Sequence, residues 1–263
     1  MMLKGKNAVI YGAAGGIGSA VARAFAREGA KLFLSGRTLP AVKALASEIA
    51  GRGGIAEAAQ VDALDEQAVE RYVGSVVEKA GAIDISFAAI SVAKDLPDKV
   101  PFSELSAQHF TLPIAAYTQS NFLTARSAAR RMSAKRSGVI LTITGVPGRL
   151  GFPTVGGNGP AYAAVEALSR GLSAELAPHG IRVVCLMPHA IPETETIREN
   201  FARYAKAAGC TPAEYQARFE NMTHLRRLTT LAELADTAAF MASDHASAIT
   251  GTTINLSGGG GPG

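Results

Sequence analysis

Glycines at a fixed spacing form the first candidate site in the chain. Residues 11–18, Y-G-A-A-G-G-I-G, follow an apolar run and lead into a helical pattern. Gly12, Gly16 and Gly18 allow a tight turn and the close approach of a pyrophosphate to the helix N-terminus, where free N–H groups and the helix dipole favour negative charge. A strand before and a helix after are the context that indicates dinucleotide binding, and a glycine turn without a ligand is the alternative.

The end of the second apolar run indicates which dinucleotide is preferred. NAD-binding proteins of this kind carry an acid there that accepts hydrogen bonds from ribose hydroxyls. This chain has no Asp or Glu between Glu28 and Glu48, and offers Arg37 after Gly36 instead. The Arg37 guanidinium can pair with a 2′-phosphate, and Gly36 leaves room for it. The pattern therefore predicts NADP(H) rather than NAD(H), with a solvated loop arginine as the alternative.

The elements that must position these residues alternate along the chain. Short β-rich runs at 7–11, 31–35, 83–87, 139–143 and 182–186 are typical of buried parallel strands. Helical spacing of apolar residues covers 18–27, 67–79, 161–176 and 231–241. The alternation predicts an α/β fold with a doubly wound parallel sheet (a Rossmann fold), in a single domain over residues 1–263. Such sheets bind ligands beyond the carboxyl ends of their strands.

A long connection follows the fifth of these runs. Residues 192–223 read as helical and contain four aromatic residues, Phe201, Tyr204, Tyr215 and Phe219. An insertion of this length over the ligand edge predicts a substrate lid, placed before the last helix and strand.

Composition excludes several classes of function. The net charge of +4 comes without a basic run, so no nucleic-acid partner and no membrane-surface partner are expected. Two cysteines, Cys185 and Cys210, and the lack of a signal-like apolar start predict a cytoplasmic location. Polar residues interrupt the uncharged stretch after Glu104, which we interpret as a buried helix rather than a membrane span. Four of the histidines show no spacing that suggests a metal site: His109, His179, His224 and His245.

Four segments together resemble the short-chain dehydrogenase/reductase family, over essentially the whole chain. They are Y-G-A-A-G-G-I-G for the family's T-G-x-x-x-G-x-G, V-D-A-L-D with Asp62 at the adenine contact, G-I-R-V-V-C-L-M-P ending at Pro188, and I-T-G-T-T-I-N-L-S-G-G. The resemblance implies a homotetramer or homodimer built through the helices around Asn121 and Tyr162. It also implies cofactor contacts at Gly12, Ala14, Gly16, Ile17, Gly18, Arg37, Asp62, Ala88, Tyr162, Glu166, Pro188 and Ile191.

The catalytic positions depart from the family pattern of Asn, Ser, Tyr and Lys. The Tyr-x-x-x-Lys motif reads Y-A-A-V-E, so Tyr162 stands but Glu166 replaces the lysine. Thr144 or Gly145 takes the place of the serine, and Thr144 keeps a hydroxyl that could orient a substrate. The family's N-N-A-G is replaced by A-A-I-S at residues 88–91, and the helix asparagine falls on Tyr117, with Asn121 one turn later. The resemblance thus assigns the catalytic roles to Tyr162, Thr144 and Glu166.

Glu166 reverses the electrostatic sign beside Tyr162. A carboxylate disfavours phenolate, so we expect Tyr162 to stay protonated and to act as a proton donor rather than a base. Glu166 can also accept hydrogen bonds from the ribose hydroxyls that the lysine binds in the family. Arg170, one turn later, could offset its charge, and a surface Glu166–Arg170 pair is the alternative.

These residues lead to one principal hypothesis and two alternatives. The principal one is an NADP(H)-dependent oxidoreductase that acts on a small carbonyl, alcohol or related substrate with an atypical proton relay. The alternatives are a non-redox enzyme on the same scaffold, and a catalytically inactive dinucleotide-binding regulator. His189, where the family usually has glycine, places an imidazole near the reacting edge, although a lone histidine is more often structural.

Overall fold

Seven parallel strands form one sheet in the computed structural model, which describes residues 1–91 and 100–261. Their order across the sheet is β3-β2-β1-β4-β5-β6-β7. The strands are β1 (Asn7–Tyr11), β2 (Lys31–Gly36), β3 (Ile55–Gln60), β4 (Ile85–Ala88), β5 (Gly138–Ile143), β6 (Ile181–Pro188) and β7 (Thr252–Leu256). The order reverses direction between β1 and β4, which is the switch point where doubly wound sheets bind ligands.

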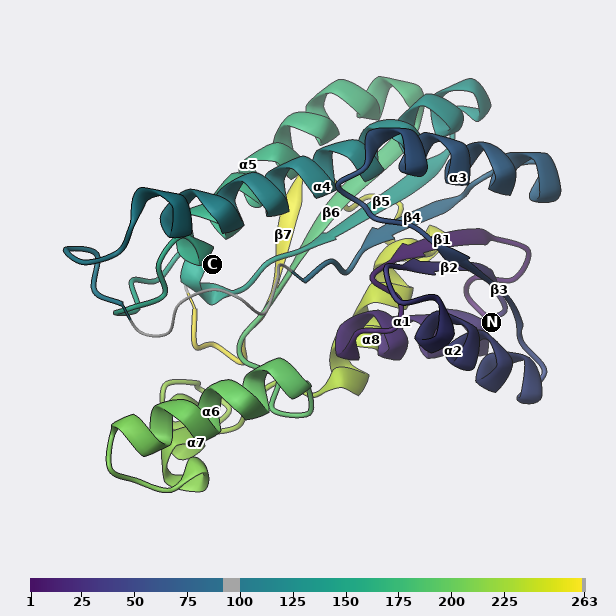
Figure 1. The fold of residues 1–263 in the computed structure, drawn as a ribbon. Helices are drawn as coiled ribbons and strands as arrows, with labels where there is room; N and C mark the ends of the chain where they lie inside the picture. Colours follow the sequence, from purple (N-terminus) through teal and green to yellow (C-terminus); the bar gives the residue numbers. More distant parts are fainter. Residues whose placement is uncertain (92–99, 262–263) are drawn as a thin grey trace.

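Two helical layers cover the sheet (Figure 1). One holds α1 (Gly16–Arg27), α2 (Leu39–Gly51) and α8 (Leu231–Ala242), and the other holds α3 (Glu66–Ala80), α4 (Ala107–Lys135) and α5 (Asn158–Leu176). Two buried clusters match these layers, one containing Phe25 and Leu234 and the other containing Tyr72 and Met132. The predicted single-domain α/β fold with a doubly wound parallel sheet is confirmed.

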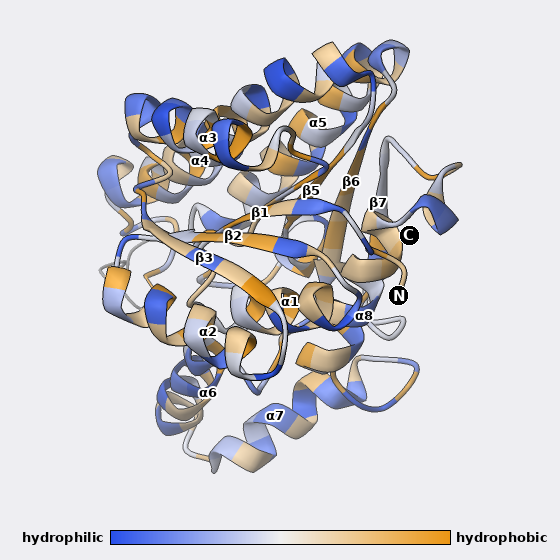
Figure 2. Cartoon of the chain, turned by 90° about the vertical axis from the view of Figure 1, so that its right-hand side faces the viewer, coloured by the Kyte–Doolittle hydropathy of each residue, from blue (hydrophilic) through white to orange (hydrophobic). Residues whose placement is uncertain are grey.

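The helices α6 (Glu195–Ala207) and α7 (Pro212–Asn221) project from the body of the molecule (Figure 1). Both lie inside the segment 192–223, and their helical structure agrees with the sequence pattern. In Figure 2 the strands between the helical layers are mostly hydrophobic, whereas α7 is mostly hydrophilic. A role of this segment as a lid stays a prediction.

The sequence locates five of the seven strands, predicts the last strand, β7, without giving its bounds, and misses β3 and α2. β3 and β7 are the edge strands, and Ile55 of β3 is 60% exposed, so neither carries a continuous apolar run. The uncharged stretch after Glu104 belongs to α4, which buries Ser120, Asn121 and Thr124. Among the described residues, no helix is long and apolar enough to cross a membrane.

Candidate active site

The glycine turn after β1 has the geometry of a dinucleotide cradle. Gly12 has φ +67°, and a Cβ there would stand 2.3 Å from the Ala89 carbonyl oxygen. A Cβ on Gly18 would stand 2.3 Å from the Gly12 carbonyl oxygen. Only glycine fits these two positions, since real Cβ contacts are never so short. No side chain caps the start of α1 at Gly15, so the first N–H groups of this helix are open to an anion.

The ends of β2 and β3 lie beside this turn. The backbone N–H of Ala13 donates to the Ser35 carbonyl at 2.9 Å, which places Arg37 two residues beyond the contact. Arg37 is exposed, and its carbonyl accepts from Gln60 Nε2 at 3.0 Å. Asp62 is exposed just after β3, where its carboxylate accepts from the Leu64 N–H at 3.0 Å. Both residues therefore lie at the carboxyl edge of the sheet, next to the glycine turn.

The remaining expected cofactor positions lie along the same edge. Ala14 is exposed and Ile17 is partly buried, both in the turn and first helical turn after β1. Ala88 ends β4 opposite Tyr11, and Pro188 ends β6 opposite Leu256. Ile191 is buried, and its carbonyl accepts from the Thr194 hydroxyl at 2.8 Å. The fold thus brings the predicted contacts to one edge, although their roles stay predictions.

Tyr162 lies on α5 against Tyr117 of α4. Their ring centroids are 5.4 Å apart, at an interplanar angle of 60°. Tyr117 and burial together raise the pKa of Tyr162 well above the ordinary 10. A tyrosine of ordinary pKa is already protonated at neutral pH, so Tyr162 is protonated there as the sequence predicts, and the first cause of its raised pKa is Tyr117 rather than Glu166.

Gly145, one of the two residues that the sequence leaves open at the family's serine position, lies beside Tyr162. A Cβ on Gly145 would stand 3.4 Å from Tyr162 Cε2, so this residue faces the tyrosine ring without a hydroxyl. The Thr144 hydroxyl lies 3.5 Å from the Cys185 Sγ, and Thr144 is buried. Of the two residues that the sequence left open, Gly145 is the one shown next to Tyr162. An orienting role for Thr144 stays a prediction.

Glu166 is buried and pairs with Arg149, which follows the short 3₁₀ turn η1 (Val146–Gly148). Arg149 Nε donates to Glu166 Oε2 at 2.8 Å, and the Thr253 hydroxyl donates to the same oxygen at 3.4 Å. The second oxygen, Oε1, is buried without a hydrogen-bond partner among residues 1–91 and 100–261. The alternative of a surface pair with Arg170 is wrong, because Glu166 faces inward whereas Arg170 is exposed.

Sequence reasoning missed Arg149 and gave Tyr117 no role of its own. Arg149 is 17 residues before Glu166, beyond the reach of any helical spacing rule. The arginine lies in the loop between β5 and α5, where no local pattern marks it as a partner for Glu166. Tyr117 is identified from the sequence only as a substitution of asparagine, and no local pattern indicates its contact with Tyr162.

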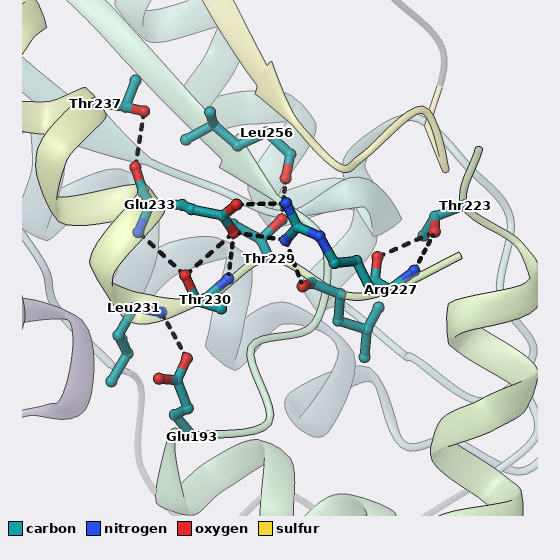
Figure 3. A network of polar contacts seen from close by, with 10 residues as sticks. Glu193, Thr223, Arg227, Thr229, Thr230, Leu231, Glu233, Thr237 and Leu256 are labelled. Carbon is teal, nitrogen blue, oxygen red and sulfur yellow. Dashed lines mark hydrogen bonds and ion pairs between the residues drawn. The ribbon is translucent and has the colours of Figure 1, made fainter. Parts of the chain in front are cut away.

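The segment that contains α6 and α7 is anchored at both ends to the start of α8 (Figure 3). At one end, the Glu193 carboxylate accepts the Leu231 N–H at 2.6 Å. At the other end, Arg227 forms a two-bond ion pair with Glu233, and the Thr223 hydroxyl donates to the Arg227 carbonyl at 3.0 Å. Arg227 and the Thr230 cap lower the pKa of Glu233 to about 2. These bonds hold both ends of the projecting segment against the start of α8.

Comparison with known proteins places these features in a family context. Residues 12–260 match the family model described as Enoyl-(Acyl carrier protein) reductase. Sorbitol dehydrogenase of Cereibacter sphaeroides is 30% identical over 98% of this chain and 98% of its own length.

Two solved structures share the fold at 24% sequence identity. NAD+-bound xylitol dehydrogenase has a TM-score of 0.90, covering 98% of this chain and all of that one. A gluconate 5-dehydrogenase from Burkholderia cenocepacia J2315, in complex with NADP and tartrate, has a TM-score of 0.87 over 98% of this chain and 96% of that one. At this identity, the two structures support the fold alone.

Proposed function

Because the chain belongs to the short-chain dehydrogenase/reductase family, we propose that it is an NADP(H)-dependent oxidoreductase acting on a small carbonyl or alcohol substrate, with an atypical proton relay. The observation that carries the proposal is the place of Tyr162, whose ring lies against Tyr117 and beside Gly145 just after β5, and whose hydroxyl is protonated at neutral pH. A protonated hydroxyl at this position is the donor that reduction of a carbonyl requires.

The described residues fit a nicotinamide dinucleotide. The open N-terminus of α1 and the close backbone approach at Gly12 and Gly18 suit a pyrophosphate. Arg37 is exposed at the end of β2, where it would pair with a 2′-phosphate. Glu166 Oε1 is a buried acceptor without a partner in the described part of the chain, and a ribose hydroxyl would satisfy it. When bound, the cofactor supplies or accepts hydride.

The chain itself supplies the proton. In the direction of reduction, the Tyr162 O–H donates its proton to the substrate oxygen, and the phenolate left behind takes a proton from water, with the adjacent Tyr117 as the relaying group. Gly145 leaves the ring edge of Tyr162 uncovered, so no serine hydroxyl shares this task. Arg149 neutralises Glu166, which leaves the carboxylate as a binding group rather than a base.

Cofactor binding and turnover test the proposal separately. Titration of the protein with NADPH and NADH by calorimetry should show tighter binding of NADPH. Oxidation of NADPH, followed by its absorbance over a panel of aldehydes, ketones and imines, should reveal turnover. Tight NADPH binding without turnover on any compound would instead favour the inactive regulator. A product formed without a change in NADPH absorbance would favour the non-redox enzyme.

The proposal includes a small-molecule substrate, self-association and a cytoplasmic location. α4 and α5 pack against each other, and Phe122 of α4 is 42% exposed, which suits a dimer or tetramer interface on this helix. Sedimentation at micromolar concentration should then show a dimer or tetramer, and a monomer alone would contradict this part. The location rests on the cysteine content of the sequence.

A further inference from the structure

His189 presents a buried donor that no residue in the described ranges satisfies. It follows β6 directly, and only 6% of the residue is exposed. Its Nδ1 accepts the backbone N–H of Ala190 at 2.8 Å, so the proton of the neutral ring is on Nε2. Burial lowers the pKa of His189 below the ordinary 6.5, which keeps the ring neutral at pH 7. Nε2 is buried and has no hydrogen-bond partner among residues 1–91 and 100–261.

Two aromatic rings pack against the His189 imidazole. Phe152, from the loop after β5, meets the imidazole edge to face at a centroid distance of 6.4 Å. Phe219 of α7 meets it at 5.8 Å, and the two phenyl rings lie nearly parallel at 14°. Gly260 packs closely on the imidazole, since a Cβ there would stand only 3.0 Å from the imidazole Cδ2. The ring that carries the donor is therefore packed against two phenyl rings and a glycine backbone.

The loop between β5 and α5 joins this environment to Tyr162. Hypothetical Cβ atoms on Gly145 and Gly148 would stand 3.4 Å and 3.0 Å from Tyr162 atoms. A few residues later, the same loop packs Phe152 against His189. One continuous loop thus contacts both Tyr162 and His189, which suits a substrate that reaches from the tyrosine to the imidazole.

We propose that His189 is a specificity-determining residue that donates its Nε2–H to an uncharged oxygen of a substrate whose body is an apolar ring lying on Phe152 and Phe219. This proposal rests on the proposed function and names its substrate class: cyclic or aromatic ketones, and the matching alcohols, that carry a second oxygen. A neutral hydrogen-bond donor beside phenyl rings does not offset the free-energy cost of burying a charged carboxylate or phosphate. The phenyl rings also offer no hydrogen bonds to the many hydroxyls of a sugar alcohol, which would lose their hydrogen bonds to water.

Paired ligands test the proposal. Affinities for 1,4-cyclohexanedione, cyclohexanone and D-fructose are measured by calorimetry with NADP+ saturating, so that no hydride is available. We expect the dione to bind about three- to tenfold more tightly than cyclohexanone, because only the dione offers a second acceptor. His189→Leu should bring this ratio to near one, and His189→Gln, which keeps an N–H donor at similar reach, should retain most of it. His179→Gln, at an exposed histidine, is the matched control.

A spectroscopic measurement keeps the result independent of folding and turnover. In ¹⁵N-histidine-labelled protein, the signal that disappears in His189→Gln should show protonation at Nε2 and should shift on addition of the dione. A thermal unfolding scan of each variant checks that it is folded. An unshifted signal, an unchanged ratio in folded His189→Leu, or a preference for fructose would overturn the proposal.

Failure of the proposed function would give a different set of results. If NADPH is not oxidised with any ketone but the dione preference depends on His189, the redox assignment fails and the recognition role stands. If NADPH is oxidised and the preference survives in His189→Leu, the redox assignment stands and the recognition role is wrong.

Discussion

The glycine turn after β1 and the surface around Tyr162 lie at the same edge of one sheet, but they use different parts of the chain. The turn is a backbone site. Its helix, α1, begins without a side-chain cap, Gly12 has a positive φ, and at two positions a Cβ would collide with a carbonyl oxygen. The proposed catalytic end consists of side chains from α4, α5 and the loop after β5. Its tyrosine is retained, whereas its neighbours differ from the family pattern.

The comparison indicates which substitutions a backbone site and a side-chain site can each tolerate. A backbone cradle has few alternatives, because a single added methyl group meets backbone atoms that cannot move. A side-chain site can be rebuilt if each new group finds a partner. Glu166 is accommodated by Arg149, and Tyr117 takes a place beside Tyr162. The experiments below test whether the catalytic end is rebuilt in this way or is only structural.

The largest effect is expected from breaking the Glu166–Arg149 pair. Glu166→Ala should lower the free energy of unfolding by about 2–4 kcal/mol, somewhat less than for a fully enclosed pair, since Arg149 keeps some solvent contact. Urea denaturation measures the change. Arg170→Ala, the exposed control, should change stability by less than about 0.5 kcal/mol. Equal effects of the two variants would show that the buried pair has no special role.

Glu166→Lys, which restores the family residue, should be tolerated only together with Arg149→Met, because the lysine would otherwise face the guanidinium.

Tyr162→Phe tests whether the retained tyrosine performs the chemistry. We expect kcat for carbonyl reduction to fall by about 10²-fold or more, the usual effect of losing a proton donor, while NADPH affinity changes little. Steady-state kinetics on the best substrate of the panel provide the measurement. Tyr72→Phe removes a buried hydroxyl on α3 that has no hydrogen-bond partner among the described residues, and should keep full activity. Full activity in Tyr162→Phe would move the donor role to His189 or Tyr117.

Arg37→Ala tests the cofactor end. Loss of a charge-assisted pair with the 2′-phosphate should weaken NADPH binding by about ten- to a hundredfold and leave NADH binding unchanged. Calorimetric titration of both cofactors gives the ratio. Lys43→Ala removes an exposed positive charge from the neighbouring α2 and should affect both cofactors equally and little. A parallel loss of both affinities in Arg37→Ala would contradict phosphate recognition.

Tyr117→Phe should have the smallest effect on rate and a distinct effect on pH dependence. Tyr117 is the largest cause of the raised pKa of Tyr162, so its removal lowers that pKa toward the ordinary value. Carbonyl reduction needs the protonated hydroxyl, and its alkaline loss should therefore begin at lower pH in the variant. At neutral pH, kcat should fall by about three- to tenfold. An alkaline limb at the same pH in both proteins would show that Tyr117 does not influence the donor.

The sequence by itself determined where five of the strands and the glycine turn lie. Apolar runs at 7–11 and 31–35 and the glycines after them are local signals, since strand burial and turn geometry depend on neighbouring residues. The sequence sets no bounds for the edge strands β3 and β7, because partial exposure removes the apolar run that identifies a strand.

Only the tertiary structure decided how the catalytic end is assembled. The sequence placed Tyr162 and Glu166 one turn apart but offered Arg170, the next residue on that helix face, as the partner of Glu166. The chosen partner is Arg149, brought in by the turn after β5. Tyr117 contacts Tyr162, and Phe152 and Phe219 contact His189, across longer gaps in the chain. Local periodicity cannot specify such contacts, because they depend on how separate elements pack on the sheet.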